Sequence, residues 1–471
     1  MTFAAILEAA CPGLVLETAD AILETYGKDW SDMRGGSPSA VAFPDSVEQV
    51  CQLVHAARRS GTALVPSGGR TGLSGGAVPL GGEVVVSFER MRRIVAFDRV
   101  DRTVTVEAGV TTGAVQQFAR EKGLYYPVSF ASEGSSHIGG NIATNAGGIR
   151  VLRYGLTRDR VAGLRVVTGR GDVLDCNRGL VKNASGYDLR HLFVGSEGTL
   201  GLVVEATLRL AEPPPPSRVM LLALPDLGRL MSVFGHLRSR LSLSAFEFLD
   251  ARSMSHVRRA DDLPAPVSLD SPWYVITEFD CAGEDQEQSA LAAFEECARQ
   301  GWLSDGVISQ SERQIAELWR YREGIAESVA PRGPYKNDLS VGISRVPEFL
   351  TRLQQLLKEH YPDYDVLCYG HIGDGNVHLN ILRPEHVSEE VFMARCEEIS
   401  EKCYELTANL GGSASAEHGI GVIKAPWRGT TRSAAEFELM RGIKDVFVPD
   451  GILNPGKLLS SGSGPGGSTG P

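Results

Sequence analysis

Two histidines in the segment YGHIGDGNVHLN have the type and spacing of ligands for a divalent metal ion. The dipeptide Asp374-Gly375 predicts a two-residue type I′ hairpin turn, because both central residues of that turn need a positive φ. Counting outward from this turn places His371 directly opposite His378. Asn380 lies two residues farther along and shares their face. The spacing therefore predicts two imidazoles and an amide gathered on one side of a β-ribbon.

A carboxylate would complete such a site, and Glu417 in the glycine-rich segment SASAEHGIG offers one beside His418. Three protein ligands suffice, because water usually takes the remaining position of a catalytic metal ion. Adjacent side chains of an extended chain point in opposite directions, so Glu417 and His418 need a turn to act together. Gly419 allows that turn. The alternative interpretation is a pair of surface histidines on a hairpin that binds no ion.

The composition is that of an acidic globular protein. Of the 471 residues, 22% are charged and 42% hydrophobic, and the net charge of −11 argues against binding of nucleic acid. The eight cysteines include no C-x-x-C pair, which indicates free thiols in a reducing compartment and excludes a cysteine-ligated iron–sulfur cluster. The N-terminal segment lacks a secretory pattern, and no apolar run approaches the ~20 residues that span a bilayer. We expect a cytoplasmic protein with no transmembrane segment.

Helical and strand periodicities alternate in the first half of the chain, which is rich in glycine. An apolar stripe predicts a helix that begins near Ser46 and ends at Gly61. A second predicted helix runs from about Thr112 to Lys122. Strand patterns occur at three further places: Ala63–Pro66, Val84–Phe88 and Thr103–Glu107.

The four prolines Pro213–Pro216 predict a domain boundary. A second α+β block follows, with a strand predicted at Trp273–Phe279 and a helix at Leu350–His360. The chain then returns to glycine and proline turns around one predicted helix, about Ala435–Phe447. The Ser, Gly and Pro composition at the end of the chain predicts a disordered tail over 461–471.

Three glycine-rich loops in the first half can approach an anion closely with their backbone N–H groups. They read PSGGRTGLSGG from Pro66, SEGSSHIGGNIATNAGG from Ser132 and FVGSEGTLG from Phe193. None is a Walker or Rossmann fingerprint, which weakens the case for ATP or NAD. Any one loop is explained equally well by tight turns without a ligand. Three of them in one block favour a large dinucleotide held among them.

Six motifs (PSGGRTG, IGGNIATNAGG, FVGSEGTLG, GHIGDGNVH, SAEHGIG and GILNPGK) resemble, in the same order, those of the FAD-linked D-2-hydroxy-acid dehydrogenases, flavoproteins of the vanillyl-alcohol-oxidase type. The resemblance covers about residues 38–460. Within this family the chain is most similar to members that act on D-2-hydroxyglutarate, notably in SHIGGN and GYDL.

The resemblance implies an α+β fold, in which a two-lobed FAD-binding domain receives an inserted α+β cap that is the substrate domain. We expect the FAD-binding domain at 1–212 and the substrate domain at 213–415. A C-terminal segment, 416–460, would then return to the FAD-binding domain, ahead of the tail at 461–471.

The resemblance also implies how FAD is bound. Family members with covalently attached flavin place a His in or near the first loop, where this chain has Arg70, so we expect non-covalent FAD. The expected FAD contacts lie in the three loops and in the C-terminal motif: Pro66, Ser67, Gly68, Gly69, Arg70, Thr71, Gly72, Ser132, Gly134, Ser135, Ile138, Gly139, Gly140, Asn141, Thr144, Asn145, Gly147, Gly148, Gly198, Gly201 and Asn454.

At the substrate, the resemblance assigns His371, His378 and Glu417 to a Zn²⁺ or Mn²⁺ ion, which lowers the barrier to removal of the hydroxyl proton. His418 is the expected catalytic base, because imidazole titrates near the working pH, while hydride passes to flavin N5. The expected substrate-binding residues are Arg322, Lys336, Asn380 and His418.

The expected function is FAD- and divalent-metal-dependent oxidation of a D-2-hydroxy acid to the 2-keto acid, with D-2-hydroxyglutarate to 2-oxoglutarate favoured. One departure stands against that choice: hydroxyglutarate-type relatives tend to carry Thr where this chain has Ala326, one helical turn from Arg322. The alternatives are a D-lactate or glycolate dehydrogenase, and a catalytically silent flavin-fold subunit of an electron-transfer complex. The expected electron acceptor is an electron-transfer flavoprotein or a quinone, and a homodimer is possible.

Overall fold

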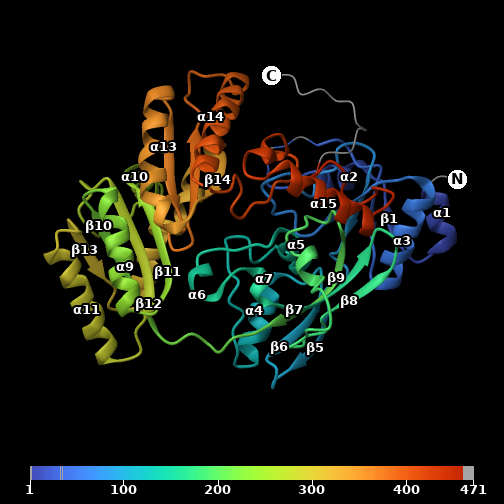
Figure 1. Cartoon of the computed structure of the whole chain (residues 1–471), viewed down its shortest axis with the longest axis horizontal. Helices are drawn as coiled ribbons and strands as arrows, with labels where there is room; N and C mark the ends of the chain where they lie inside the picture. The colour runs from blue at the N-terminus through green and yellow to red at the C-terminus, as the bar shows by residue number, and fades with distance from the viewer. Residues whose placement is uncertain (1–2, 32, 34, 460–471) are drawn as a thin grey trace.

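The computed structural model describes residues 3–31, 33 and 35–459, so the predicted tail at 461–471 lies outside the described residues. The strands form three sheets, of four, five and seven strands. Figure 1 shows the seven-stranded sheet and its helices on one side of the molecule, with the two smaller sheets on the other. No helix in the described ranges is long and apolar enough to cross a bilayer.

The N-terminal lobe contains α1 (Phe3–Ala10), β1 (Val15–Glu17), α2 (Asp20–Tyr26), β2 (Ala40–Phe43), α3 (Val47–Ser60), β3 (Leu64–Ser67) and β4 (Val84–Ser87). Its sheet has the order β1-β2-β4-β3, in which β2, β4 and β3 are parallel. As predicted, α3 begins where Ser46 accepts the N–H of Gln49 and ends at Gly61, whose φ is +70°. The first glycine-rich loop leaves the end of β3.

The second lobe contains β5 (Ile94–Asp98), β6 (Thr103–Glu107), α4 (Thr112–Glu121), α5 (Ile138–Thr144), α6 (Val151–Tyr154), α7 (Thr157–Arg160), β7 (Val161–Thr168), β8 (Val173–Cys176), α8 (Arg190–Phe193) and β9 (Gly201–Arg209). Its five strands form an antiparallel sheet of order β5-β6-β9-β7-β8. The second glycine-rich loop contains α5, and the third joins α8 to β9. All three loops therefore lie at the ends of elements in these two lobes.

The seven-stranded sheet lies in the segment after the prolines. This segment contains β10 (Ser217–Leu224), η1 (Leu227–Arg229), α9 (Leu230–Arg240), β11 (Leu243–Asp250), α10 (Ala251–Asp261), β12 (Trp273–Asp280), α11 (Glu284–Arg299), β13 (Asp305–Ile308), α12 (Glu312–Val329), η2 (Ala330–Arg332), β14 (Tyr335–Ser340), η3 (Ile343–Arg345), α13 (Val346–His360), β15 (Asp365–Gly370), β16 (Asn376–Leu382) and α14 (Glu389–Asn409). The strand order is β13-β10-β12-β11-β15-β16-β14.

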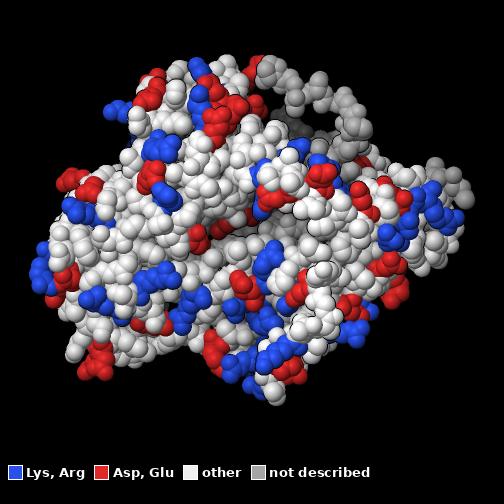
Figure 2. Space-filling model, in the orientation of Figure 1, with Lys and Arg blue, Asp and Glu red and all other residues white. Residues whose placement is uncertain are grey.

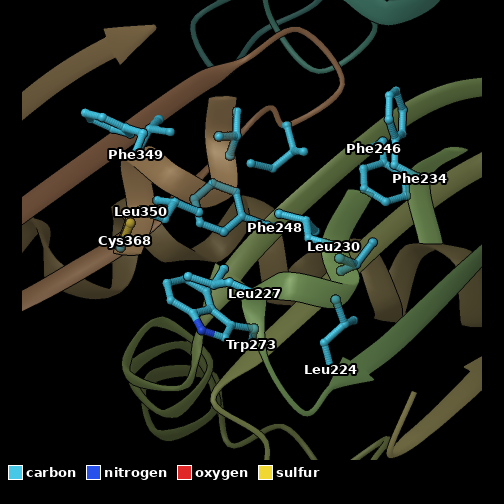
Figure 3. Packing of buried hydrophobic residues seen from close by; sticks show 14 of the residues in the cluster. Leu224, Leu227, Leu230, Phe234, Phe246, Phe248, Trp273, Phe349, Leu350 and Cys368 are labelled. Atoms are coloured by element: carbon cyan, nitrogen blue, oxygen red, sulfur yellow. The ribbon is translucent and has the colours of Figure 1, made fainter. Parts of the chain in front are cut away.

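The two faces of this sheet differ. One face packs against α9, α11, α13 and α14 in the largest apolar core of the described chain. Figure 3 shows the aromatic part of that core, where the rings of Phe234 and Phe246 lie 4.8 Å apart and Phe248 packs on Trp273. The other face packs against α10 and α12 through a smaller apolar cluster. Its remaining area is lined by polar side chains from β11, β14, β15 and β16, and these form the site described below.

The end of the described chain returns to the N-terminal lobe. After α14 come η4 (Ala425–Thr430) and α15 (Ala434–Phe447). Leu453 then pairs with Leu64 of β3, and it is buried in the core beneath α3. The edge strand β3 is therefore covered by a segment from the far end of the sequence.

The predicted elements agree with the structure except in the hairpin turn. The predicted strands are β3, β4, β6 and β12, and the predicted helices are α3, α4, α13 and α15, although α13 begins earlier, at Val346, with Pro347 in its first turn. The hairpin of β15 and β16 pairs Tyr369, not His371, with His378. The predicted type I′ turn is therefore wrong.

The actual turn is a wider loop. The carbonyl of His371 accepts the N–H groups of Gly375 and Asn376, and of the two predicted turn residues only Gly375 has a positive φ. The side chain of Asn376 donates to Asp338 and to a backbone carbonyl on β14, which holds it in the sheet. Because the register differs by two residues, an even number, the same side chains still share one face.

Candidate active site and cofactor cavity

A cavity of about 660 Å³ lies between the glycine-rich loops and the polar face of the seven-stranded sheet. Figure 2 shows this side of the molecule hollowed near its middle, with acidic and basic side chains at the edge. Most of the residues predicted to bind FAD line the cavity: Pro66, Ser67, Gly68, Gly69, Arg70, Thr71, Gly72, Ser132, Gly139, Gly140, Asn141, Thr144, Gly147, Gly148, Gly198 and Gly201.

The remaining predicted FAD contacts lie away from the cavity wall. Gly134 and Ser135 are exposed, and Ile138 is part of the apolar core of the second lobe. Asn145 ends α5 in the left-handed conformation. Asn454 is fully buried and donates to two backbone carbonyls of the first and third loops. Asn454 therefore holds these two loops together.

The cavity wall suits a polar ligand of the size of a dinucleotide. Among the described residues, the buried Oγ of Ser67 and Nδ1 of His137 have no hydrogen-bond partner, and both residues line the cavity. Buried polar atoms normally have partners, so these two indicate a ligand that supplies them. Gly69 must be glycine, because a Cβ there would lie 2.0 Å from the carbonyl oxygen of Ser135. The guanidinium of Arg70 lies 4.0 Å from the ring centre of Tyr26.

The three predicted metal ligands are brought together at one end of this cavity. His371, His378 and Glu417 each offer a ligand atom within 4.8 Å of the others. The two imidazole rings lie 5.2 Å apart and nearly perpendicular. Nε2 of His371 lies 3.4 Å from Oε1 of Glu417. The turn at Gly419, whose φ is +79°, lets Glu417 and His418 both reach the cavity.

The pKa shifts of Glu417, His371 and His378 agree with a site for a cation. Burial is the largest influence on Glu417 and raises its pKa to about 8. Burial opposes the charged form of His371, but Glu247 and Glu417 outweigh it and raise the pKa of His371 to about 9. Burial, followed by the charge of His371, holds the pKa of His378 well below its ordinary value. A divalent cation can replace the protons that this cluster otherwise retains.

A second group, Asp338, His378 and His418, also has three ligand atoms within 4.8 Å. However, one carboxylate oxygen of Asp338 already accepts three backbone N–H groups, and Nζ of Lys424 lies 3.8 Å from it. A cation there would compete with these donors and be repelled by the lysine. At the group of His371, His378 and Glu417, Nη2 of Arg322 lies 3.5 Å from Nε2 of His371, but the carboxylates of Glu247 and Glu417 outweigh this positive charge. This group is therefore the better candidate for a metal site.

His418 lies beside the metal group, with its ring stacked at 6.0 Å from that of His378. Burial is the largest influence on it and lowers its pKa below 6.5, although Asp338 acts in the opposite direction. The imidazole is therefore neutral at pH 7 and able to accept a proton.

The predicted substrate-binding residues line the same part of the cavity. Arg322 lies on α12, with its guanidinium 4.9 Å from the ring centre of Tyr369. Lys336 and Asn380 are register partners on β14 and β16, and the amide of Asn380 donates to the hydroxyl of Tyr369. Ala326 lines the cavity from the same helix as Arg322.

Sequence reasoning missed the buried carboxylates that hold these residues. Glu247 on β11 lies 2.8 Å from Nε of Arg322 and 2.7 Å from Nδ1 of His371. Asp338 on β14 contacts the loop that carries Glu417. The signal for Glu247 was available, because an acid in the apolar run LSAFEFLD must be paired if that strand is buried.

Two family models match the chain: one described as FAD binding domain covers residues 38–177, and one described as FAD linked oxidases, C-terminal domain, covers residues 213–458. The chain belongs to the FAD-linked oxidase family. This FAD-linked oxidase is 55% identical over 459 residues to the D-2-hydroxyglutarate dehydrogenase of Xanthomonas citri pv. viticola, covering 98% of this chain and 97% of that protein. It is 50% identical over 450 residues to the D-2-hydroxyglutarate dehydrogenase of Stutzerimonas stutzeri, covering 96% and 97%.

A solved structure of 4-ethylphenol oxidase from Gulosibacter chungangensis superposes with a TM-score of 0.76 at 19% identity, covering 97% of this chain and 96% of that one. The expected α+β fold, with an FAD-binding domain and a cap, is confirmed. This FAD-linked oxidase is a flavoprotein oxidoreductase that uses FAD, which argues against the alternative of a catalytically silent subunit.

Proposed function

We propose that this FAD-linked oxidase is a divalent-metal-dependent D-2-hydroxyglutarate dehydrogenase that forms 2-oxoglutarate. The observation that carries the proposal is that His371, His378 and Glu417 converge in the same cavity as the FAD loops, beside Arg322 and Lys336. The similar bacterial proteins named D-2-hydroxyglutarate dehydrogenase support the choice of substrate.

The chemistry divides between bound groups and side chains. His371, His378 and Glu417 would hold a Zn²⁺ or Mn²⁺ ion that would lower the pKa of the substrate hydroxyl, and FAD bound among the glycine-rich loops would serve as the hydride acceptor. Neutral His418 accepts that hydroxyl proton, since its lowered pKa keeps it unprotonated at pH 7. Asn380 orients the substrate through its side-chain amide, which Tyr369 holds.

Two cations bind the carboxylates of the substrate. Arg322 donates its Nε–H to Glu247, and its Nη2 lies 3.5 Å from both ring nitrogens of His371, at that end of the cavity. Lys336 approaches from β14 and lines the cavity, so its charge is available to an anion bound there. Charge-assisted bonds contribute about 1.5–3 kcal/mol each, so a second carboxylate raises kcat/KM by about one to two orders of magnitude.

We also propose non-covalent FAD and a division into domains at 212 and 415. The prolines at 213–216 separate β9 of the five-stranded sheet from β10 of the seven-stranded sheet, which supports the first boundary. The return of Leu453 to β3 supports a C-terminal segment that belongs with the FAD-binding lobes.

The deciding experiment compares D-2-hydroxyglutarate, its L enantiomer and D-lactate with the purified flavoprotein and an artificial dye acceptor. D-2-hydroxyglutarate should give the highest kcat/KM, and a chelator should abolish turnover until Zn²⁺ or Mn²⁺ is returned. Arg322→Lys, which keeps a cation for Glu247 but loses the planar fork, should raise KM for the diacid more than for D-lactate. Arg320→Lys is the matched control, because Arg320 lies on the same helix but is exposed and paired with Asp261.

D-lactate is the alternative substrate, and Ala326 favours it by leaving the cavity wall beside Arg322 without a hydroxyl. Equal efficiency on the monoacid and the diacid would identify that activity. Full turnover in a metal-free preparation would end the metal part of the proposal.

A further inference from the structure

The loop from Ser415 to Lys424 carries both Glu417 and His418, and two buried carboxylates hold its backbone. Asp338 on β14 accepts the N–H groups of the first part of the loop, residues 416–418. Glu197, from the third glycine-rich loop, accepts the N–H groups of residues 420 and 421. The two reactive side chains lie on the part that Asp338 holds.

Asp338 is itself tightly held. It is 0% exposed, and one oxygen of its carboxylate accepts N–H groups at 3.1, 2.9 and 3.0 Å from three consecutive residues of the loop. Its other oxygen accepts the side-chain amide of Asn376 at 2.9 Å. Lys424, at the end of the same loop, donates to the backbone carbonyl of Asp338.

The strand register adds a further contact. Asp338 is the direct partner of His378 across β14 and β16, and its carboxylate lies 3.6 Å from Nδ1 of that imidazole. One side chain therefore touches a metal-ligand histidine directly, and holds the backbone of Glu417 and of the proton-accepting His418.

We propose that Asp338 is a positioning residue that sets where Glu417 and His418 point. Three consecutive N–H groups that converge on one anion form a concave backbone conformation, which the anion stabilises. Without the anion the three donors lose their partner in a buried place, and the loop relaxes. The inference rests on the proposed function, because that function gives Glu417 and His418 their roles.

Asparagine cannot replace Asp338. Its amide has one acceptor and one donor group, whereas Asp338 accepts on both sides, from Asn376 and from the loop. In either orientation, the NH₂ group of the asparagine would therefore face another donor, which is either the amide of Asn376 or the N–H groups of the loop. The Asp338→Asn substitution keeps the size of the side chain but removes one acceptor oxygen and also the negative charge beside His378, His418 and Lys424. The Asn376→Ala variant described below keeps that charge, so it separates the two effects.

The test measures Zn²⁺ affinity, flavin content, kcat and KM of Asp338→Asn in the full-length flavoprotein. Zn²⁺ should bind about 10–100-fold more weakly, as for other residues that orient metal ligands. A misplacement of about 1 Å costs about 100-fold in rate, so kcat should fall by about that factor while flavin content stays unchanged.

Asp250→Asn is the matched control. Asp250 is another acid of the same sheet whose carboxylate accepts backbone N–H groups, but from Ser253 and Cys368, which are not part of the reactive loop. The Asp250→Asn substitution should lower the melting temperature without changing Zn²⁺ affinity or kcat. Unchanged Zn²⁺ affinity and kcat in Asp338→Asn, or equal losses in both variants, would overturn the proposal.

If Asp338→Asn does not fold, Asn376→Ala decides. It removes the hydrogen bonds of Asn376 to Asp338 and to the backbone carbonyl of Leu339 without changing charge. Zn²⁺ binding should weaken and kcat should fall several-fold; no change in either would refute the positioning role. A wild-type protein that binds no Zn²⁺ and needs no metal would overturn the proposed metal function instead. The kcat of these variants would then still report on the placement of His418.

Discussion

The carboxylate of Glu247 lies 2.7 Å from Nδ1 of His371. This pairing leaves Nε2 of the same ring facing Glu417, at 3.4 Å. A carboxylate behind a histidine selects the ring tautomer and makes the other nitrogen a stronger metal ligand. Glu247 also binds Arg322, so one buried acid connects the metal-ligand cluster to the residue proposed to bind the substrate carboxylate.

Replacing this acid tests that connection. Glu247→Gln should weaken Zn²⁺ binding about 10–100-fold, measured by competition with a chromophoric chelator. Asp365→Asn is the control, because Asp365 at the start of β15 pairs with His256 of α10, and this histidine–carboxylate pair lies outside the cavity. Equal Zn²⁺ affinity in wild type and Glu247→Gln would show that His371 needs no such support.

Metal affinity should depend on pH. Glu417 and His371 have pKa values raised to about 8 and about 9, so the cation must displace their protons at neutral pH. The apparent affinity should therefore rise as pH increases toward about 9, by up to about tenfold per unit for each proton displaced. Isothermal titration with Zn²⁺ at several pH values in buffers of different ionisation enthalpy measures both the affinity and the proton release. A dissociation constant that stays flat across this range would contradict the prediction.

The decrease in kcat/KM at acidic pH should reflect the protonation of His418. Only its neutral form accepts a proton, and its pKa lies below 6.5. With Zn²⁺ kept saturating at every pH, kcat/KM should therefore rise with pH through a midpoint below 6.5 and then level off. His418→Gln should lower kcat by about 10²–10⁴-fold while flavin and metal contents stay at wild-type values. Loss of metal in this variant would mean that His418 is a ligand instead.

Substrate choice should respond to Ala326. Ala326→Thr places a hydroxyl in the cavity wall, on the same helix as Arg322. A new hydrogen bond to a carboxylate is worth about 1.5 kcal/mol or more, so the ratio of kcat/KM for D-2-hydroxyglutarate over D-lactate should rise about tenfold. Ala316→Thr is the matched control, because it makes the same change at an exposed position of α12 and should leave the ratio at its wild-type value. An unchanged ratio in Ala326→Thr would show that the distal carboxylate binds elsewhere.

FAD should leave the protein on denaturation. Arg70 points to the ring of Tyr26 and offers no nucleophile for a covalent link to flavin. Acid precipitation should therefore release the flavin into the supernatant, where its absorbance and fluorescence quantify it. Yellow colour that remains with the precipitated polypeptide would contradict this prediction.

Local sequence signals predicted the elements but not the partners across the sheet. The two ends of α3 were predicted correctly, at Ser46 and Gly61, because helix capping depends on only a few neighbouring residues. The type of the hairpin turn was predicted wrongly, because Asn376 is held by Asp338 on a neighbouring strand, β14. The apolar run around Glu247 indicates a buried acid that needs a partner, but nothing near it in the sequence identifies that partner, because the neighbourhood of β11 and β15 is not encoded locally. The strand order, which brings these acids to the histidines, is a property of the whole chain.

The pairing of Leu453 with Leu64 also has a consequence for biosynthesis. On the ribosome, β3 is made early, but the segment that covers its outer edge emerges only after nearly all of the chain. Until then the nascent N-terminal lobe presents an open strand edge, the kind of surface that pairs with other chains. Stalled or truncated translation products that end before residue 453 should therefore aggregate or depend on chaperones, and FAD loading should follow release of the finished polypeptide.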